Sequence, residues 1–220
     1  MFTEITVDPF VRGWLHRASN GTGDALVLTH GAGGNCNAPL LVILAETFCA
    51  AGITVLRCDL PYRQSRPYGP SGPHDGKRDR AGLKNAIDVM KNLSSGRIFL
   101  GGQSYGGRQA SILCSEEPVD SPTAVSALLL LSYPLHPPGK PEQPRTQHLT
   151  NLHTRTLFVE GTRDPFASIP EIEQALQLIP AETRLLTVED AGHDLGFKGK
   201  SKRDQLPAKV LTEFQKLLSE

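Results

Sequence analysis

The stretch that decides the fold is LGGQSYGGRQA, residues 100–110. It contains the pattern G-x-S-x-G at Gly102, Ser104 and Gly106, between an apolar segment and a run compatible with a helix. In this context the pattern is typical of a nucleophile elbow, a tight turn from strand to helix that strains the serine backbone and leaves no space for side chains two residues away. We therefore expect the hydroxyl of Ser104 to stand in the open at the head of a helix.

Around this turn, short apolar segments alternate with longer segments of helical period. That alternation predicts an α/β fold with a mostly parallel central sheet flanked by helices. The expected strands are Phe2 to Val7, Ala25 to His30, Thr54 to Cys58, Arg97 to Gly101, Ser126 to Leu131, Thr156 to Glu160 and Arg184 to Val188, with a further edge strand allowed near Trp14.

Three segments are expected to form amphipathic helices, in addition to the helix that follows Ser104. Asn37 is a candidate cap for the first, which has Pro39 at its second position and ends at Ala51-Gly52. The second follows the apolar positions Leu83, Ala86, Ile87, Met90 and Leu93, and the third follows Leu206, Val210, Leu211, Phe214, Leu217 and Leu218.

Length and composition limit the classes of protein that remain. The chain has 220 residues without a break in composition, which predicts one domain spanning residues 1–220. Lys plus Arg and Asp plus Glu both number 23, so the net charge is zero and nucleic acid is not an expected partner. No apolar run approaches the roughly 20 residues that cross a bilayer, and no signal peptide or disulfide pattern is evident, so we expect no membrane partner and a cytoplasmic location.

A serine nucleophile needs a base and a carboxylate that orients the base, and both follow in the sequence. Asp164 stands on a turn just past one expected strand, and His193 stands in a loop just past the next. The order Ser104, Asp164, His193, each at the carboxyl end of a strand, predicts a catalytic triad. Asp190 and Asp194 are rival carboxylates, and we rank Asp164 above them because it comes from another strand end.

The backbone N–H groups of Ala32 and Tyr105 are the expected oxyanion hole. The run His30-Gly31-Ala32-Gly33-Gly34 follows an apolar strand, and its small residues allow N–H groups to turn toward a substrate carbonyl. A phosphate or dinucleotide loop is disfavoured, since the run lacks both G-x-G-x-x-G and G-K-[ST]. We interpret His30 as a structural hydrogen-bonding group, because His193 already fills the role of the base.

Two proline-rich segments, Pro61 to Gly76 and Pro134 to Pro144, interrupt the alternation and are expected to lack regular structure. Each follows a strand, so each is either a wall of the substrate cleft or only a rigid connection. A basic bias around the site indicates either a carboxylated or phosphorylated substrate or a solvated charged face; it comes from Arg57, Arg63, Arg66, Lys77, Arg78 and Arg80.

The elbow, the glycine run and the Asp164 and His193 loops resemble the α/β-hydrolase superfamily over nearly the whole chain. More narrowly, residues 101–108, 132–140 and 161–166 resemble the hydrolase-like group of testis-expressed and NSL-complex-subunit proteins, which is related to dienelactone hydrolases. This resemblance implies an α/β-hydrolase fold and hydrolysis of an ester or related acyl bond without a cofactor or metal. About 24 residues separate Leu131 from Thr156, too few for a large lid domain, so we expect the site to be open or covered by the Pro134 to Pro144 loop alone.

The expected function is that of a carboxylesterase-like serine hydrolase acting on a small-molecule ester through an acyl-enzyme intermediate. A serine peptidase or a thioesterase would share every catalytic part. A non-catalytic subunit that binds a protein partner is the alternative from another class, and the complete set of catalytic residue types counts against it. The sequence assigns no side chain to substrate binding.

Overall fold

The inner parallel strands of the sheet are buried on both faces, which explains their apolar runs. The structure, a computed structural model, describes residues 2–117, 125–197 and 205–219. Within these residues an eight-stranded sheet has the order β1-β2-β4-β3-β5-β6-β7-β8. The strands are β1 (Phe2–Val7), β2 (Val11–His16), β3 (Ala25–Thr29), β4 (Thr54–Cys58), β5 (Ile98–Gln103), β6 (Ala127–Leu131), β7 (Thr156–Gly161) and β8 (Thr183–Val188).

Only β2 runs against the direction of the other strands. β1 pairs antiparallel with β2, and β2 pairs antiparallel with β4, whereas the pairs from β4 to β8 are all parallel. β2 is the additional strand allowed near Trp14, but it lies between β1 and β4, and β1 forms the edge of the sheet. The mostly parallel central sheet that the sequence predicted is confirmed, and residues 132–155, between β6 and β7, form no separate domain.

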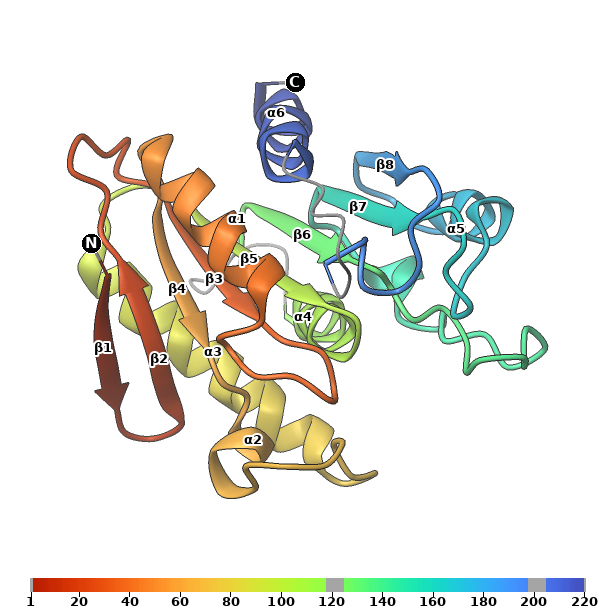
Figure 1. Ribbon diagram of the computed structural model, residues 1–220, viewed down its shortest axis with the longest axis horizontal. Coiled ribbons are helices and arrows are strands. Elements are labelled where there is room, and N and C mark those ends of the chain that lie inside the picture. Colours follow the sequence, from red (N-terminus) through yellow and green to blue (C-terminus); the bar gives the residue numbers. More distant parts are fainter. Residues whose placement is uncertain (1, 118–124, 198–204, 220) are drawn as a thin grey trace.

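Helices cover both faces of this sheet (Figure 1). They are α1 (Pro39–Ala50), α2 (Pro61–Ser65), α3 (Asp75–Leu93), α4 (Tyr105–Glu116), α5 (Ile169–Leu176) and α6 (Leu206–Ser219), with a 3₁₀ turn, η1, at Leu149–Asn151. Apolar side chains of α1 and α6 pack on one face, and those of α3, α4 and α5 pack on the other. Side chains of β3 alternate between the two cores, as the two-residue period of a strand requires.

Two expectations about helices were wrong. The cap of α1 is Ala38, not Asn37, whose Oδ1 instead accepts a hydrogen bond from Arg57 Nη1 at 3.2 Å. The segment from Pro61 to Gly76 is not wholly irregular, since α2 begins at Pro61 and α3 begins at Asp75. Proline suits the first turn of a helix because its missing N–H is not needed there. Helix α5 was not expected from the sequence.

All four cysteines are free thiols, with Cys36 and Cys58 buried and Cys49 and Cys114 half-buried. Among the described residues, no helix is long and apolar enough to cross a membrane.

Candidate active site

Ser104 lies in the turn between β5 and α4, with the strained backbone expected of an elbow. Its φ is 50° and its ψ is −117°, a left-handed conformation that costs a residue with a side chain about 1–3 kcal/mol. The neighbouring glycines permit the turn, since a Cβ on Gly102 would lie 2.6 Å from backbone atoms of Gly106 and Gly107. A Cβ on Gly106 would lie 2.5 Å from the carbonyl oxygen of His30. The tight turn thus holds Ser104 at the carboxyl end of β5.

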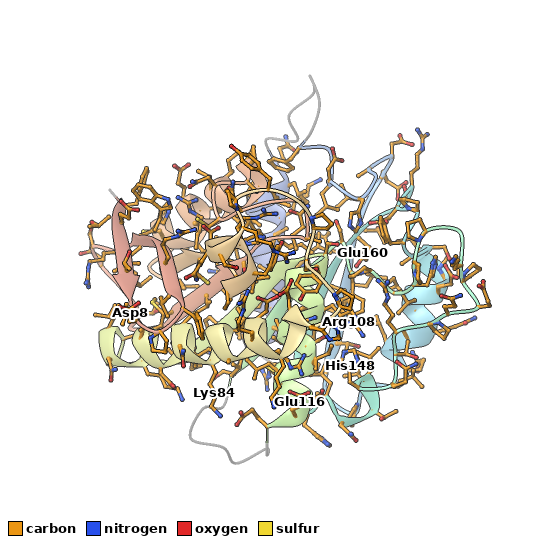
Figure 2. The ribbon with its side chains drawn as sticks, turned by 90° about the horizontal axis from the view of Figure 1, so that it is seen from below. Asp8, Lys84, Arg108, Glu116, His148 and Glu160 are labelled. Carbon is orange, nitrogen blue, oxygen red and sulfur yellow. The ribbon has the colours of Figure 1, made fainter. Side chains whose placement is uncertain are left out.

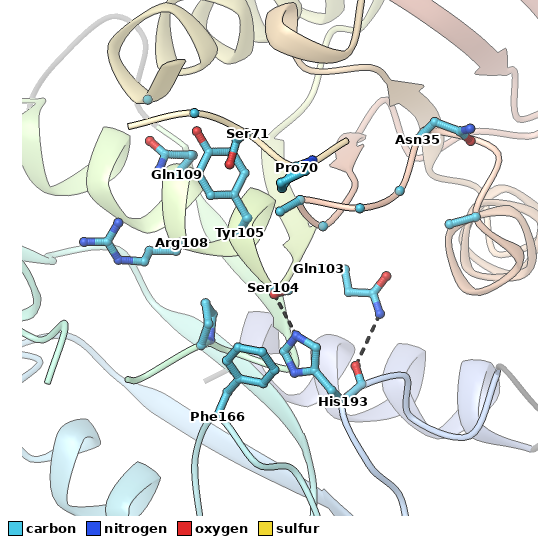
Figure 3. A pocket seen from close by; sticks show the side chains of 18 of the residues that line it. Asn35, Pro70, Ser71, Gln103, Ser104, Tyr105, Arg108, Gln109, Phe166 and His193 are labelled. Atoms are coloured by element: carbon cyan, nitrogen blue, oxygen red, sulfur yellow. Dashed lines mark hydrogen bonds between the residues drawn. The ribbon is translucent and has the colours of Figure 1, made fainter. Parts of the chain in front are cut away.

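Two short hydrogen bonds join the three side chains that the sequence singled out. His193 Nε2 lies 2.7 Å from Ser104 Oγ, and His193 Nδ1 lies 2.7 Å from Asp164 Oδ2. The Asp164 side chain is fully buried, whereas that of His193 is 27% exposed. In this geometry Nδ1 donates its proton to the carboxylate, which leaves Nε2 as the acceptor that faces the hydroxyl. Figure 3 shows the contact between Ser104 and His193 at the centre of the cleft.

Local contacts fix the positions of the aspartate and the histidine. Phe166 N donates to Asp164 Oδ1 at 2.8 Å, and the Phe166 ring stacks on His193 with centroids 4.1 Å apart. Gly161 brings the two loops together, because a Cβ there would lie 2.3 Å from the carbonyl oxygen of Ala191.

Neither of the rival carboxylates, those of Asp190 and Asp194, forms the hydrogen bond with His193 Nδ1. Asp190 points to solvent and pairs with Arg163, Nη2 to Oδ1, at 2.6 Å. Asp194 Oδ1 accepts a hydrogen bond from Gly196 N at 2.9 Å within its own turn. Asp164 is the carboxylate that contacts the His193 ring.

The glycine loop at residues 31–34 lies directly beside Ser104. A Cβ on Gly31 would lie 3.4 Å from Ser104 Cβ. Tyr62 Oη donates to Ala32 O at 2.7 Å, and Arg63 Nη2 donates to the same carbonyl at 3.1 Å. These bonds hold the carbonyl of Ala32, while its N–H has no hydrogen-bond acceptor within the described part of the chain. The N–H of Tyr105, in the first turn of α4, has no partner inside the helix either.

His30 has the structural role expected of it. It is fully buried, its Nε2 accepts a hydrogen bond from Leu60 N at 3.1 Å, and its Nδ1 lies 2.9 Å from the carbonyl oxygen of Gly31. Burial lowers its pKa, which favours the neutral ring. The histidine thereby ties the glycine loop to the end of β4.

Ser104 opens onto a cleft of about 1710 Å³. The first proline-rich segment forms one wall, with Pro70 and Ser71 among the lining residues (Figure 3). The second contributes its first residue, Pro134, to the lining, and the rest of that segment lies outside it. The first segment is therefore a wall of the cleft, and the second is chiefly a connection.

The basic residues noted in the sequence divide into structural and cleft-lining groups. Arg57 is buried against His16 Nε2, and Arg63 donates to four backbone carbonyls, so both are structural. Arg66 and Arg78 pair with Asp75. Lys77 and Arg80 line the cleft, and Arg80 Nε pairs with Glu116 at 2.9 Å.

Phe166, Arg108 and Arg145 are among the cleft-lining residues to which the sequence analysis assigned no role. Arg108 stands four residues after Ser104 and therefore on the same side of α4, a spacing that could have identified it. Arg145 lies in a loop far along the chain, and no local pattern in the sequence points to it.

A second serine–histidine contact lies behind the cleft. Ser111 Oγ is 2.9 Å from His148 Nε2, and both atoms lie 3.1 Å from Tyr133 Oη. Ser111 is fully buried, and within the described residues no carboxylate contacts His148. This group therefore lacks both the access and the oriented base that the Ser104 group has.

Elsewhere in the described chain, no group of three or more His, Cys, Asp or Glu side chains is arranged to hold a metal ion.

A serine, a histidine and a buried aspartate linked in this order at the carboxyl edge of a mostly parallel sheet define the site of an α/β hydrolase. The family model described as an alpha/beta hydrolase domain matches residues 22–219. The chain belongs to this family.

Several solved structures share the fold over nearly their whole length. Est1E from Butyrivibrio proteoclasticus has a TM-score of 0.73 at 17% identity, and the match covers 100% of this chain and 99% of the Est1E chain. Est1E with ferulic acid bound has a TM-score of 0.74 at 16% identity, and the match covers 99% of this chain and 100% of that chain. Dienelactone hydrolase from Anabaena variabilis has a TM-score of 0.72 at 19% identity, covering 99% and 97%. The protein XC6422 from Xanthomonas campestris, described as a serine hydrolase without a lid, has a TM-score of 0.70 at 15% identity, covering 98% and 94%.

Proposed function

We propose that this chain is a carboxylesterase-like serine hydrolase that cleaves a small carboxylic ester through an acyl-enzyme. The observation that carries the proposal is the pair of 2.7 Å hydrogen bonds linking Ser104 to His193 and His193 to Asp164. A hydroxyl in contact with a neutral imidazole, which a buried carboxylate orients, is the arrangement that activates serine.

In the proposed reaction, Ser104 Oγ attacks the ester carbonyl carbon while His193 Nε2 accepts the hydroxyl proton. The N–H groups of Ala32 and Tyr105 donate to the oxyanion of the tetrahedral intermediate, and each such donor is worth roughly a hundredfold to a thousandfold in rate. His193 then returns the proton to the leaving alkoxide, and the acyl group stays on Ser104. Water attacks the acyl-enzyme with His193 as base, which releases the carboxylic acid and restores the serine.

The open cleft supports a small substrate rather than a long lipid chain. Est1E has been solved with ferulic acid, itself a small carboxylic acid, although its 16% identity transfers no specificity to this chain. The competing proposal is that this chain binds a protein partner without catalysis. It rests on the three segments that resemble testis-expressed and NSL-complex-subunit proteins. The two proposals differ in whether Ser104 is reactive.

The test is intact-mass analysis after treatment with a fluorophosphonate probe, which captures an activated serine covalently. We expect one adduct on the wild type, none on Ser104→Ala, and much slower capture by His193→Ala. Ser111→Ala is the matched control, since it removes the other serine in contact with a histidine, and it should be labelled like the wild type. A folded wild type that forms no adduct, or an adduct that persists in Ser104→Ala, would refute the proposal.

Steady-state hydrolysis of a 4-nitrophenyl ester then separates the roles within the triad. Loss of Ser104 or His193 should remove nearly all covalent catalysis, whereas Asp164→Ala should retain more activity because the aspartate orients the base and takes no proton. Equal residual rates for all three variants would contradict the assigned role of Asp164.

A further inference from the structure

Arg108 and Arg145 bring two guanidinium groups into the same cleft as Ser104. Both are half-buried and both line the cleft. Arg108 lies one turn along α4 from Ser104, and its backbone N–H donates to Ser104 O at 2.9 Å. Arg145 lies in the loop between β6 and β7, where its backbone N–H donates to Leu135 O at 2.7 Å. Two separate elements thus present cations to one region of the cleft.

These two arginines differ from the other arginines near the cleft because their side chains form no hydrogen bond or ion pair with another described residue. Arg66 pairs with Asp75, Arg80 pairs with Glu116, and Arg63 donates to backbone carbonyls. Over residues 2–117, 125–197 and 205–219, no carboxylate lies within ion-pair distance of Arg108 or Arg145. The Nε atom of Arg108 is moreover buried, and no described residue accepts a hydrogen bond from it. A buried donor that lacks an acceptor is expensive, and native structures rarely keep one without a reason.

Neighbouring positive charges add to the free-energy cost of burying the two guanidinium groups. Burial, followed by the charge of Arg108, lowers the pKa of Arg145. Burial and the charges of Arg108 and Arg80 lower the pKa of the adjacent His148 to about 4, so it is neutral at physiological pH (Figure 2). The described residues that line the cleft include one carboxylate, that of Asp194, and four basic side chains: Lys77, Arg80, Arg108 and Arg145. In a chain of zero net charge, the cleft is locally positive.

We propose that Arg108 and Arg145 form an anion subsite that binds a carboxylate or phosphate group carried by the substrate. This inference rests on the proposed function and names the class of ester that the site prefers. An anion between the two guanidinium groups would accept charge-assisted hydrogen bonds and would offset the repulsion between the two cations.

The geometry assigns the anion to the acyl portion of the ester. The leaving group must lie against His193, which returns the proton to it, whereas Arg108 lies on the other side of Ser104 in Figure 3, beside Tyr105 and Gln109. Side chains four residues apart on a helix have Cβ atoms about 5–6 Å apart, and an extended arginine reaches further. Several bonds therefore separate the anionic group from the scissile carbonyl, as in the half-ester of a dicarboxylic acid.

The experiment compares two esters of equal chain length, 4-nitrophenyl hydrogen adipate and 4-nitrophenyl methyl adipate, which differ in the charge at the far end. We expect kcat/KM to be higher for the hydrogen adipate in the wild type. The ratio of the two kcat/KM values should fall roughly tenfold to a hundredfold in Arg108→Met or Arg145→Met, the range of a charge-assisted hydrogen bond. High salt should reduce the wild-type ratio as well.

Arg17→Met is the matched control for charge. Arg17 is exposed and follows the end of β2, which runs antiparallel to β4 and so ends at the opposite edge of the sheet. This variant should keep the wild-type ratio. Hydrolysis of both esters through Ser104 with a ratio near one, or a ratio that neither cleft arginine changes, would overturn the subsite and leave the proposed hydrolase function intact.

Calorimetric titration with adipate and with inorganic phosphate tests the subsite independently of catalysis. Binding that disappears in the Arg108→Met/Arg145→Met double variant supports the subsite even if Ser104 does not react, and the tighter of the two ligands identifies the anion as carboxylate or phosphate. If neither anion binds the folded wild type, the inference is wrong whatever the activity of Ser104.

Discussion

The backbone of Ser104 is strained because the hydroxyl must stand clear of both β5 and α4. Its φ of 50° is maintained only because the elbow packs glycine backbones against each other and against the end of β3. Stability and site geometry therefore depend on the same few atoms. We therefore expect a substitution at one of these glycines to lower the free energy of unfolding.

Gly106→Ala tests this dependence. A Cβ there would lie 2.5 Å from His30 O and 2.7 Å from Thr29 Cγ2, so backbone must move, and we expect a loss of about 3 kcal/mol or more in the free energy of unfolding. Gly33→Ala is the control, since a Cβ at Gly33 has no atom within 4 Å; it should change stability by no more than about 1 kcal/mol. Urea denaturation measures both, and equal effects would show that the elbow is not tightly packed.

A second residue-scale prediction concerns Glu160, at the end of β7 (Figure 2). The side chain is fully buried; Oε1 accepts a hydrogen bond from Tyr133 N, and Oε2 has no partner within the described chain. Burial, with a smaller contribution from the charge of Asp164, raises its pKa well above 4.5. Glutamine reproduces the neutral, protonated form without a titratable proton.

The sign of the resulting pH dependence follows from proton linkage. Above the unfolded pKa, near 4.5, the folded state binds more protons than the unfolded state, so Glu160 lowers wild-type stability as pH rises toward its folded pKa. The stability of Glu160→Gln relative to the wild type should therefore increase with pH, by at most about 1.4 kcal/mol per unit. Urea midpoints at pH 5, 7 and 9 check this. A difference that stays constant would mean that Glu160 is ionised in the fold.

The sequence was informative about residues wherever a function depends on a local pattern. Ser104, Asp164 and His193 each stand just past a strand, so their order along the chain was enough to suggest that they meet, and they do lie in hydrogen-bond contact; their catalytic roles remain predictions. The pairing of Arg108 with Arg145 could not be foreseen, because it depends on how the loop after β6 packs across α4.

At the scale of elements, α2 fixes the glycine loop beside Ser104. Arg63, which is 4% exposed, donates to the carbonyls of Ala32, Gly34, Arg66 and Gly69. This one side chain joins the loop to the start of the proline-rich wall. The sequence predicted a proline-rich segment without regular structure here, since a helix of five residues is too short to show a helical period.

Arg63→Lys should loosen this junction, because lysine retains the charge but lacks the planar fork that reaches several carbonyls at once. We expect a loss of about 1–3 kcal/mol in stability and a severalfold fall in kcat with little change in KM, as the Ala32 amide moves. Arg12→Lys is the control, since Arg12 makes a half-exposed ion pair with Asp59. If Arg63→Lys loses stability at unchanged kcat, Arg63 supports the fold without positioning the loop.

At the scale of the whole molecule, the open question is whether the first hairpin and the body of the sheet form one folding unit. The family match begins at residue 22, after β1 and β2, yet β2 pairs closely with β4. A Cβ on Gly13 would lie 1.9 Å from Arg57 O, so the two strands are in tight contact. This contact supports the prediction of one domain over residues 1–220.

Phe214→Ala tests that prediction from the far side of the sheet. In α6, Phe214 packs against Phe99 and Phe48, with ring centroids 5.2 and 5.6 Å apart, and truncation of such a buried ring costs about 3–5 kcal/mol. The one tryptophan, Trp14, reports on β2, and far-ultraviolet circular dichroism reports on the helices. If the chain is one cooperative unit, the two signals should shift to the same lower urea midpoint. If the Trp14 transition keeps its wild-type midpoint while the helical signal moves, the hairpin and the hydrolase body fold separately and the prediction fails.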